Sequence, residues 1–147
     1  MRTKTIAGVA LAAIVTASAP GHAQPAMNRL EVAIKPLFDD PKLVKRLPEG
    51  VKFYFGPQAV DVAQDLGPTN SYRMTVRGAR TKADACRWAL LSSLKAMGEQ
   101  AQKAGGNAVV GLYSVIGEDH RSEATFICVF SENTLSVSLR GTMAVVK

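Results

Sequence analysis

The sequence predicts an α+β fold in which one long helix packs on an antiparallel β-sheet, with an extra strand and short helix on the N-terminal side. Three patterns support this fold class. Apolar residues recur every three or four positions across 81–104, which is typical of an amphipathic helix. Residues 107–116 have apolar side chains at both odd and even positions, as in a strand that is covered on both faces. Residues 123–130 are expected to form a further strand, and apolar residues alternate with serines along 135–139, which indicates a strand with one buried face.

The N-terminus has the three parts of a secretory signal peptide, which we assign to residues 1–23. Arg2 and Lys4 precede an apolar run too short to cross a bilayer as a mature helix, and small residues end at Ala23. We therefore expect cleavage near Ala23 and a periplasmic or secreted mature chain without a transmembrane span. The alternative is a frayed apolar tail on a cytosolic protein. Without the leader, the formal net charge of +6 falls to about +4, a modest excess that does not imply a nucleic-acid partner.

The mature chain is long enough for one domain and too short for two. Residues 24–50 have an irregular pattern, and we expect an N-terminal arm with a short helix that starts where Asp40 precedes Pro41. A linker, or a segment integral to the fold, is the alternative for this region. The single α+β domain is expected at 51–147.

The domain is expected to begin with a short strand at 51–55, which is rich in aromatic residues. Residues 58–70 have no clear period and are expected to be mostly connection. The next strand shows period-two alternation. We expect its apolar residues on a buried face and its polar residues in solvent; the two sets are Tyr72, Met74 and Val76, and Arg73, Thr75 and Arg77.

The long helix is expected to start after Thr81, which can cap it together with Asp84, and to stop at Gly105. Gly98 in its interior indicates close contact with the sheet. The stripe expected to face the core consists of Ala83, Cys86, Leu90, Leu94, Met97, Ala101 and Ala104.

Two strands are expected after the apolar segment 107–116. The strand at 123–130 should turn Phe126, Cys128 and Phe130 toward the helix. In the last strand, leucines and valine alternate with serines, and Gly141 indicates a bulge before the final apolar residues.

Cys86 and Cys128 are the only cysteines in the sequence. Both remain after the expected cleavage, and an exported protein reaches a compartment in which disulfides persist. We therefore predict that they pair, which in the chain-entropy model stabilises the fold by roughly 4 kcal/mol. The alternative is two buried free thiols that pack as small apolar side chains.

Two segments of the C-terminal half resemble a known family. The helix is followed by Ala104-Gly-Gly-Asn-Ala-Val-Val-Gly111, and the chain closes with Arg140-Gly-Thr-Met-Ala-Val-Val146. Both segments are similar to motifs of the YbjQ-like heavy-metal-binding family, a Gly-Ala-Asn-Ala-Val-Val-Gly turn and a closing Gly-Thr-Ala strand. The same half also resembles the periplasmic domain of RcsF-like envelope-stress lipoproteins, and Asp65-Leu66-Gly67 is similar to a segment upstream of the helix there.

The resemblance implies a β-α-β-β core, and the YbjQ-like family implies a ring-like homo-oligomer. Disulfides clamp helix to sheet in the RcsF-like domain, so that resemblance also implies a bridge between Cys86 and Cys128. The chain departs from the RcsF-like pattern because it has one cysteine pair and no lipid-anchor cysteine. This departure argues against a signalling role anchored in the outer membrane.

Transition metals are bound by thiolate, imidazole and carboxylate groups gathered in one place. The one local group of such residues in the expected mature chain consists of Glu118, Asp119, His120 and Glu123. We interpret it as a solvated loop and expect no metal and no cofactor. A metal site in this loop, completed across subunits, is the alternative.

Catalytic motifs are absent from the sequence. Ser122 lies near His120, but neighbouring loop positions rarely hold the geometry of a triad, and there is no Gly-x-Ser-x-Gly elbow. The phosphate-binding motif Gly-x-x-x-x-Gly-Lys-Ser/Thr is also missing, and Gly105 and Gly106 end a helix, whereas a phosphate loop opens one. We therefore expect a protein that is not an enzyme.

The densest basic stretch is a candidate surface for an anionic polymer, since Tyr72 and Trp88 lie nearby in the sequence. It consists of Arg73, Arg77, Arg80, Lys82 and Arg87. We favour the alternative of a solvated strand face followed by a helix start, because exported proteins seldom meet nucleic acid.

Together these patterns favour an exported, non-enzymatic interaction or scaffold domain of the bacterial envelope. We expect it to assemble with itself or with an envelope protein through exposed sheet surface, and to have no nucleic-acid partner. A metal-binding protein that uses residues 118–123 and a binder of anionic envelope polymers are the alternatives.

Overall fold

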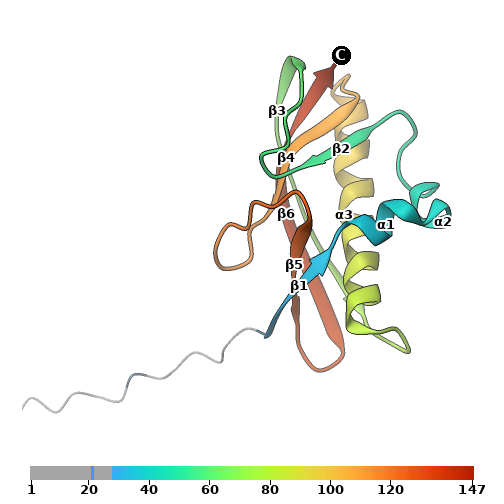
Figure 1. Cartoon of the computed structure of the whole chain (residues 1–147), viewed down its shortest axis with the longest axis vertical. Coiled ribbons are helices and arrows are strands. Elements are labelled where there is room, and N and C mark those ends of the chain that lie inside the picture. Colours follow the sequence, from blue (N-terminus) through green and yellow to red (C-terminus); the bar gives the residue numbers. More distant parts are fainter. Residues whose placement is uncertain (1–20, 22–27) are drawn as a thin grey trace, which may run out of the picture.

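The computed structural model describes Gly21 and residues 28–147, so the expected signal peptide, apart from Gly21, and its cleavage site lie outside the described residues. The described chain forms one long helix, two short ones and a six-stranded sheet (Figure 1). In chain order the elements are β1 (Asn28–Ala33), α1 (Lys35–Asp39), α2 (Pro41–Val44), β2 (Lys52–Phe55), β3 (Val62–Val76), α3 (Lys82–Lys103), β4 (Ala108–Ser114), β5 (Thr125–Phe130) and β6 (Thr134–Val146).

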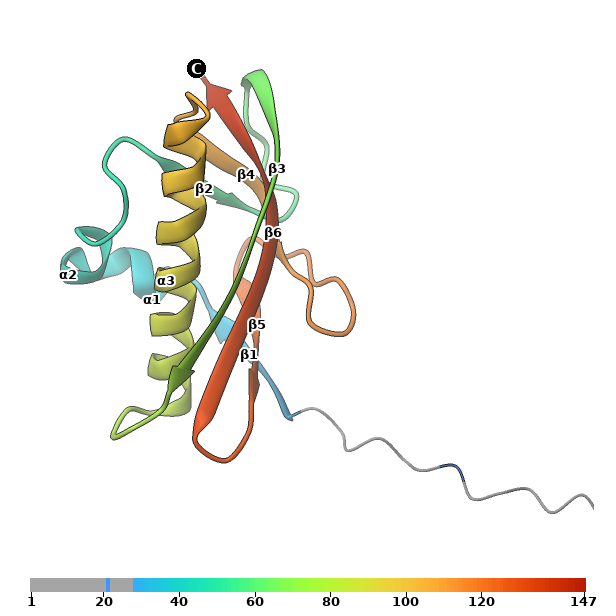
Figure 2. The same ribbon diagram turned by 180° about the vertical axis from the view of Figure 1, so that it is seen from behind.

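The strands follow the order β1-β5-β6-β4-β2, and β3 pairs with β6. Ser136 of β6 pairs with Val129 of β5 and with Met74 of β3, so β3 lies on the side of β6 opposite β5. Figure 2 shows β3 and β6 as a long twisted pair beside α3. The predicted α+β fold with one long helix on a sheet is confirmed.

The sheet is not purely antiparallel, which corrects the sequence-based expectation. β2 pairs with β4 in parallel, whereas the other strand pairs are antiparallel. Parallel neighbours need a long crossover connection. Here β3 and α3 lie between β2 and β4 in the chain and provide it.

The predicted ends of the long helix are confirmed. The Thr81 hydroxyl accepts a hydrogen bond from the Asp84 backbone N–H at 3.1 Å. At the other end Gly105 has a φ of +85°, and Gly106 N–H donates to the Ala101 carbonyl at 2.8 Å. This is a Schellman motif, in which a glycine in the left-handed region satisfies the last carbonyls of the helix.

The capping hydroxyl allows a direct test of helix stability. Thr81→Ala should lower the free energy of unfolding by about 1 kcal/mol, because the Asp84 N–H then has no side-chain acceptor. Urea denaturation measures this change, and Thr81→Ser is the control that keeps the hydroxyl. Equal destabilisation by the two variants would contradict the capping role.

The core lies between α3 and the sheet. Cys86, Leu90 and Leu94 of the predicted stripe are fully buried, whereas Ala83 is half-buried and Ala104 is exposed where the helix ends. β5 and β6 provide the sheet side of this core. Of the three residues predicted to face the helix from β5, Phe126 and Cys128 are fully buried and Phe130 is half-buried. The fully buried side chains of β6 are Leu135, Val137 and Leu139.

The predicted bulge lies on β4 and not at Gly141. The register between β4 and β6 shifts between Val110 and Tyr113, and Gly111 has a φ of +61°. Gly141 faces this bulge, and a Cβ on Gly141 would lie 3.0 Å from the Leu112 side chain. The bulge also alters the expected alternation, because Val109 and Leu112 both join the helix-side core.

Residues 28–50 are an integral part of the fold. β1 pairs with β5 over its whole length, from Asn28 opposite Phe130 to Ala33 opposite Thr125. Leu37 of α1 is fully buried in the main core. The short helix at Asp40-Pro41 forms as predicted, with the Asp40 carboxylate accepting from the Lys42 N–H at 2.9 Å.

The prediction for the strand before the long helix was wrong about where the strand begins and about which of its faces is buried. β3 begins at Val62, within the segment expected to be connection. Tyr72, Met74 and Val76 were expected to be buried, yet their exposed fractions are 54%, 60% and 57%. The residues of β3 that are buried on the helix side are Thr69 and Ser71.

The pairing register explains the reversed face. Directly paired residues in a sheet project to the same side. Ser71 pairs with Leu139, and Thr75 pairs with Leu135. Because the leucines of β6 pack against α3, the small polar residues of β3 share the helix side, and the apolar residues between them point outward.

Candidate functional site

The outer face of β3 carries a row of exposed apolar side chains, which we call the β3 row: Tyr72, Met74 and Val76. Monomeric proteins commonly expose single apolar residues, whereas a row of neighbouring apolar side chains is a candidate interaction surface. Tyr72 and Met74 pair with Ser138 and Ser136 of β6. These small neighbours leave the apolar side chains standing above the sheet.

β3 is also an edge strand. Among the described residues its one strand partner is β6, so the other side of β3 has backbone groups that no strand satisfies. The register with β6 is continuous from Pro68 to Val76 and shifts before Pro68. An extended, regular edge of this kind accepts an added strand through main-chain hydrogen bonds.

A basic hollow of about 550 Å³ adjoins the β3 row on the same face. Asn70 and Arg140, which pair with each other, line it together with Arg121. The Arg121 guanidinium lies 3.6 Å from the centre of the Tyr113 ring and 3.4 Å from the Asp119 carboxylate. The apolar row is therefore bordered by positive charge at its Asn70 end.

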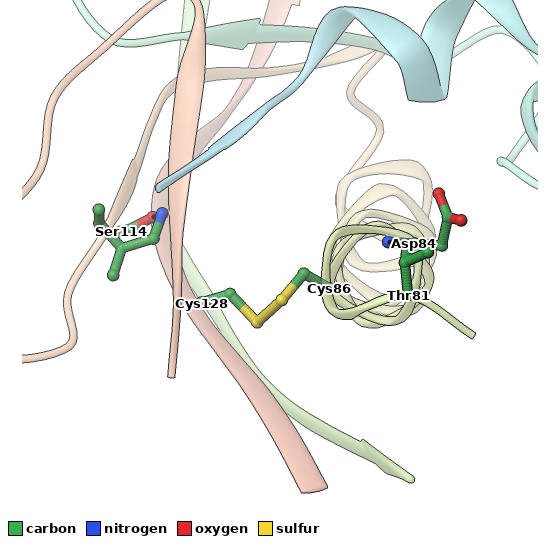
Figure 3. The surroundings of a disulfide bond; sticks show 6 residues. Thr81, Asp84, Cys86, Ser114 and Cys128 are labelled. Carbon is green, nitrogen blue, oxygen red and sulfur yellow. Dashed lines mark hydrogen bonds between the residues drawn. A yellow bond between two sulfur atoms is a disulfide. The ribbon is translucent and has the colours of Figure 1, made fainter. Parts of the chain in front are cut away.

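Two other parts of the outer face are buried. The Ser114 hydroxyl is buried and accepts from the Ile127 N–H at 2.9 Å. Figure 3 shows Ser114 on the side of β5 opposite the disulfide. A second small cluster, Ala108, Ala144 and Val146, is covered by Tyr54 and Val60.

The loop at residues 118–123 does not gather metal ligands. Among residues 28–147 no three His, Cys, Asp or Glu side chains lie close enough together to hold a metal ion. Asp119 pairs with Arg121, while Glu118 and Glu123 are exposed. His120 instead joins a polar group that sequence reasoning missed.

That polar group links the loop to β1. His120 Nε2 lies 2.9 Å from the Thr125 hydroxyl, which donates to the Glu31 carboxylate at 2.7 Å. Ser122 Oγ accepts from the Thr125 backbone N–H at 3.1 Å, and no hydrogen bond joins Ser122 to His120 among the described residues. These contacts tie the loop at residues 118–123 to β1.

The five basic residues singled out in the sequence have different partners. Two of them, Arg73 and Arg77, make hydrogen bonds to the carbonyls of Tyr72 and Arg80. Arg87 pairs with Asp84 at 3.1 Å. Lys82 Nζ lies 3.9 Å from the centre of the Phe130 ring.

Trp88 is the centre of a small basic surface. The guanidinium groups of Arg80 and Arg46 lie 4.9 Å and 5.0 Å from the centre of its ring. Sequence reasoning noted Trp88 near the basic stretch that contains Arg80, but it missed Arg46, because Arg46 lies in the N-terminal region. No local pattern links these two distant segments.

The predicted disulfide is present. Cys86 of α3 and Cys128 of β5 are bonded, with a Cα–Cα distance of 5.9 Å, and both are fully buried (Figure 3). The described chain has no free cysteine. The bridge therefore fixes the helix on the sheet and provides no thiolate for chemistry or metal binding.

No model of a known protein family matches this chain, and a search of curated proteins finds no relative. Within the part of the chain that the structure describes, no helix has the length and apolar character needed to cross a membrane.

Proposed function

We propose that this chain is an exported, non-enzymatic interaction domain that assembles with a second copy through β3. The observation that carries the proposal is the exposure of Tyr72, Met74 and Val76 on an edge strand. Strand addition provides main-chain hydrogen bonds, and the apolar row adds buried area on the outer face.

A second copy fits this edge by two-fold symmetry. Closed homodimers use the same surface on both subunits. If two β3 strands pair antiparallel about Met74, each Tyr72 lies opposite Val76 of the second copy, and the two rows form one continuous apolar surface. Arg73 then lies opposite Thr75, so the pairing places no two arginines directly opposite each other.

The molecular mass in solution tests this proposal. The disulfide-bonded chain should be a dimer by sedimentation and by native mass spectrometry, and Met74→Glu should weaken association by at least about tenfold, because it places two carboxylates opposite each other. Val62→Glu is the matched control, since Val62 is also exposed on β3 but lies where the register is irregular.

Two outcomes would contradict the proposal: a wild-type chain that stays monomeric at every concentration tested, or a Met74→Glu variant that dimerises as well as wild type. The same measurement with added zinc or copper separates assembly from metal binding. Retention of stoichiometric metal would favour the alternative function at residues 118–123.

A further inference from the structure

A second feature of the structure, independent of β3, is an apolar pocket of about 650 Å³ between the N-terminal helices and β2. Figure 1 shows the chain passing from α2 through a loop to β2 on this side of the molecule. The volume lies within the range of about 300–1,000 Å³ that is usual for small-molecule sites. The apolar side chains that line the pocket include Phe38, Val44, Leu47, Pro48, Val51 and Phe53.

The pocket exposes apolar side chains that the fold holds in place. Phe38 and Val44 are 36% and 38% exposed, so the core does not bury them. The Phe38 ring packs edge-on against Phe55, with ring centres 6.4 Å apart, and Phe55 is buried in the core. The wall is therefore anchored to the core and remains open to a ligand.

The opposite wall rests directly on α3. A Cβ on Gly98 would lie 2.9 Å from atoms of both Phe53 and Pro48, so glycine is what allows these two lining residues to approach the helix. The loop is also tied to α3, because the Gln102 side-chain amide donates to the Glu49 carbonyl at 2.9 Å. Both contacts preorganise the pocket before any ligand binds.

The charged residues of the pocket favour an anion. Lys45 and Lys52 line it, and Glu49 is the single acidic residue in the lining. None of these three side chains forms a salt bridge among the described residues. An apolar wall with an excess of ammonium groups is complementary to a molecule with a hydrocarbon chain and a negative head group.

We propose that this pocket binds a single-chain anionic amphiphile, with the chain against Phe38, Val44 and Phe53 and the head group near Lys45 and Lys52. The probes are decanoate and decyltrimethylammonium, each kept below its micelle concentration, and decanol, kept below its solubility limit. Calorimetric titration of the disulfide-bonded chain should give saturable binding of decanoate. Decanol should bind at least about tenfold more weakly, and the cation more weakly still.

Two sets of variants locate the site. Val44→Glu should reduce decanoate affinity at least about tenfold, because it places a carboxylate in the apolar wall. Val62→Glu is the control, since it adds the same charge at an equally exposed valine outside the pocket. The double change of Lys45 and Lys52 to Gln should weaken decanoate binding but not decanol binding, whereas Lys42→Gln, outside the lining, should change neither.

Circular dichroism of each variant separates loss of binding from loss of folding. The proposal is overturned if wild type binds none of the three probes, if it binds the cation as well as the anion, or if folded Val44→Glu binds decanoate like wild type. β3 lies outside the pocket lining, so the two proposals are tested independently. Failure to dimerise would not contradict ligand binding in the pocket, and failure to bind decanoate would not contradict dimerisation through β3.

Discussion

Replacing Cys86 and Cys128 together by alanine is expected to lower the free energy of unfolding by about 4 kcal/mol, since the bridge joins residues 42 positions apart. The cross-link restricts the unfolded chain, and both sulfur atoms lie in the core, where alanine leaves space. Equilibrium urea denaturation under oxidising conditions measures the change, and the midpoint should move to a markedly lower urea concentration.

A reductant provides the control for this prediction. It should destabilise the wild-type chain toward the level of the double variant and leave the variant unchanged. If the variant and the oxidised wild type unfold at the same urea concentration, the bridge does not stabilise the fold, and the helix is held on the sheet by side-chain packing alone.

Phe126→Ala is expected to cost about 3–5 kcal/mol of stability, the range for removing a fully buried aromatic ring. Phe126 is 1% exposed, and it is the largest of the fully buried side chains. Its position on β5 pairs with Val32 of β1, so the cavity would open where the N-terminal strand joins the main core. The same denaturation measurement reports the loss.

Val62→Ala is the matched control for the cavity effect. It also removes apolar atoms, but Val62 is exposed, and the change should stay within about 0.5 kcal/mol. A Phe126→Ala variant that is as stable as Val62→Ala would show that the core between β1 and β5 rearranges to fill the space.

The long helix was predictable because its signals are local. Thr81, Gly105 and the stripe from Cys86 to Ala101 lie within one segment, and each acts through neighbours three to five positions away. The disulfide was predictable for a different reason. With two cysteines in the sequence, there is one intramolecular pairing.

The facing of β3 was not predictable from its own pattern. Alternation shows that Tyr72, Met74 and Val76 share one face, but it does not show which face meets the helix. The choice depends on β6, because its leucines pack against the helix. Ser71 and Thr75 pair with two of these leucines and therefore lie on the helix side of the sheet. The same pairing makes the β3 row the candidate interaction surface.

The other candidate sites join segments that are distant in the sequence. Glu31 meets Thr125 across β1 and β5, and Arg46 reaches Trp88 of α3. In the apolar pocket, the lining residue Phe53 packs against Gly98 of α3. Glycine in a helix indicates a close approach, but the identity of the approaching residue depends on how the chain folds back.

The amino-acid order alone defines the helix, its two ends, most of the strand segments and the one cysteine pair, because neighbouring residues carry that information. The packing of helix on sheet determines which strand faces become surface, which edge of β3 has no strand partner and where a pocket opens. These features depend on contacts between residues tens of positions apart. The local period of a strand is the same whichever of its faces is buried.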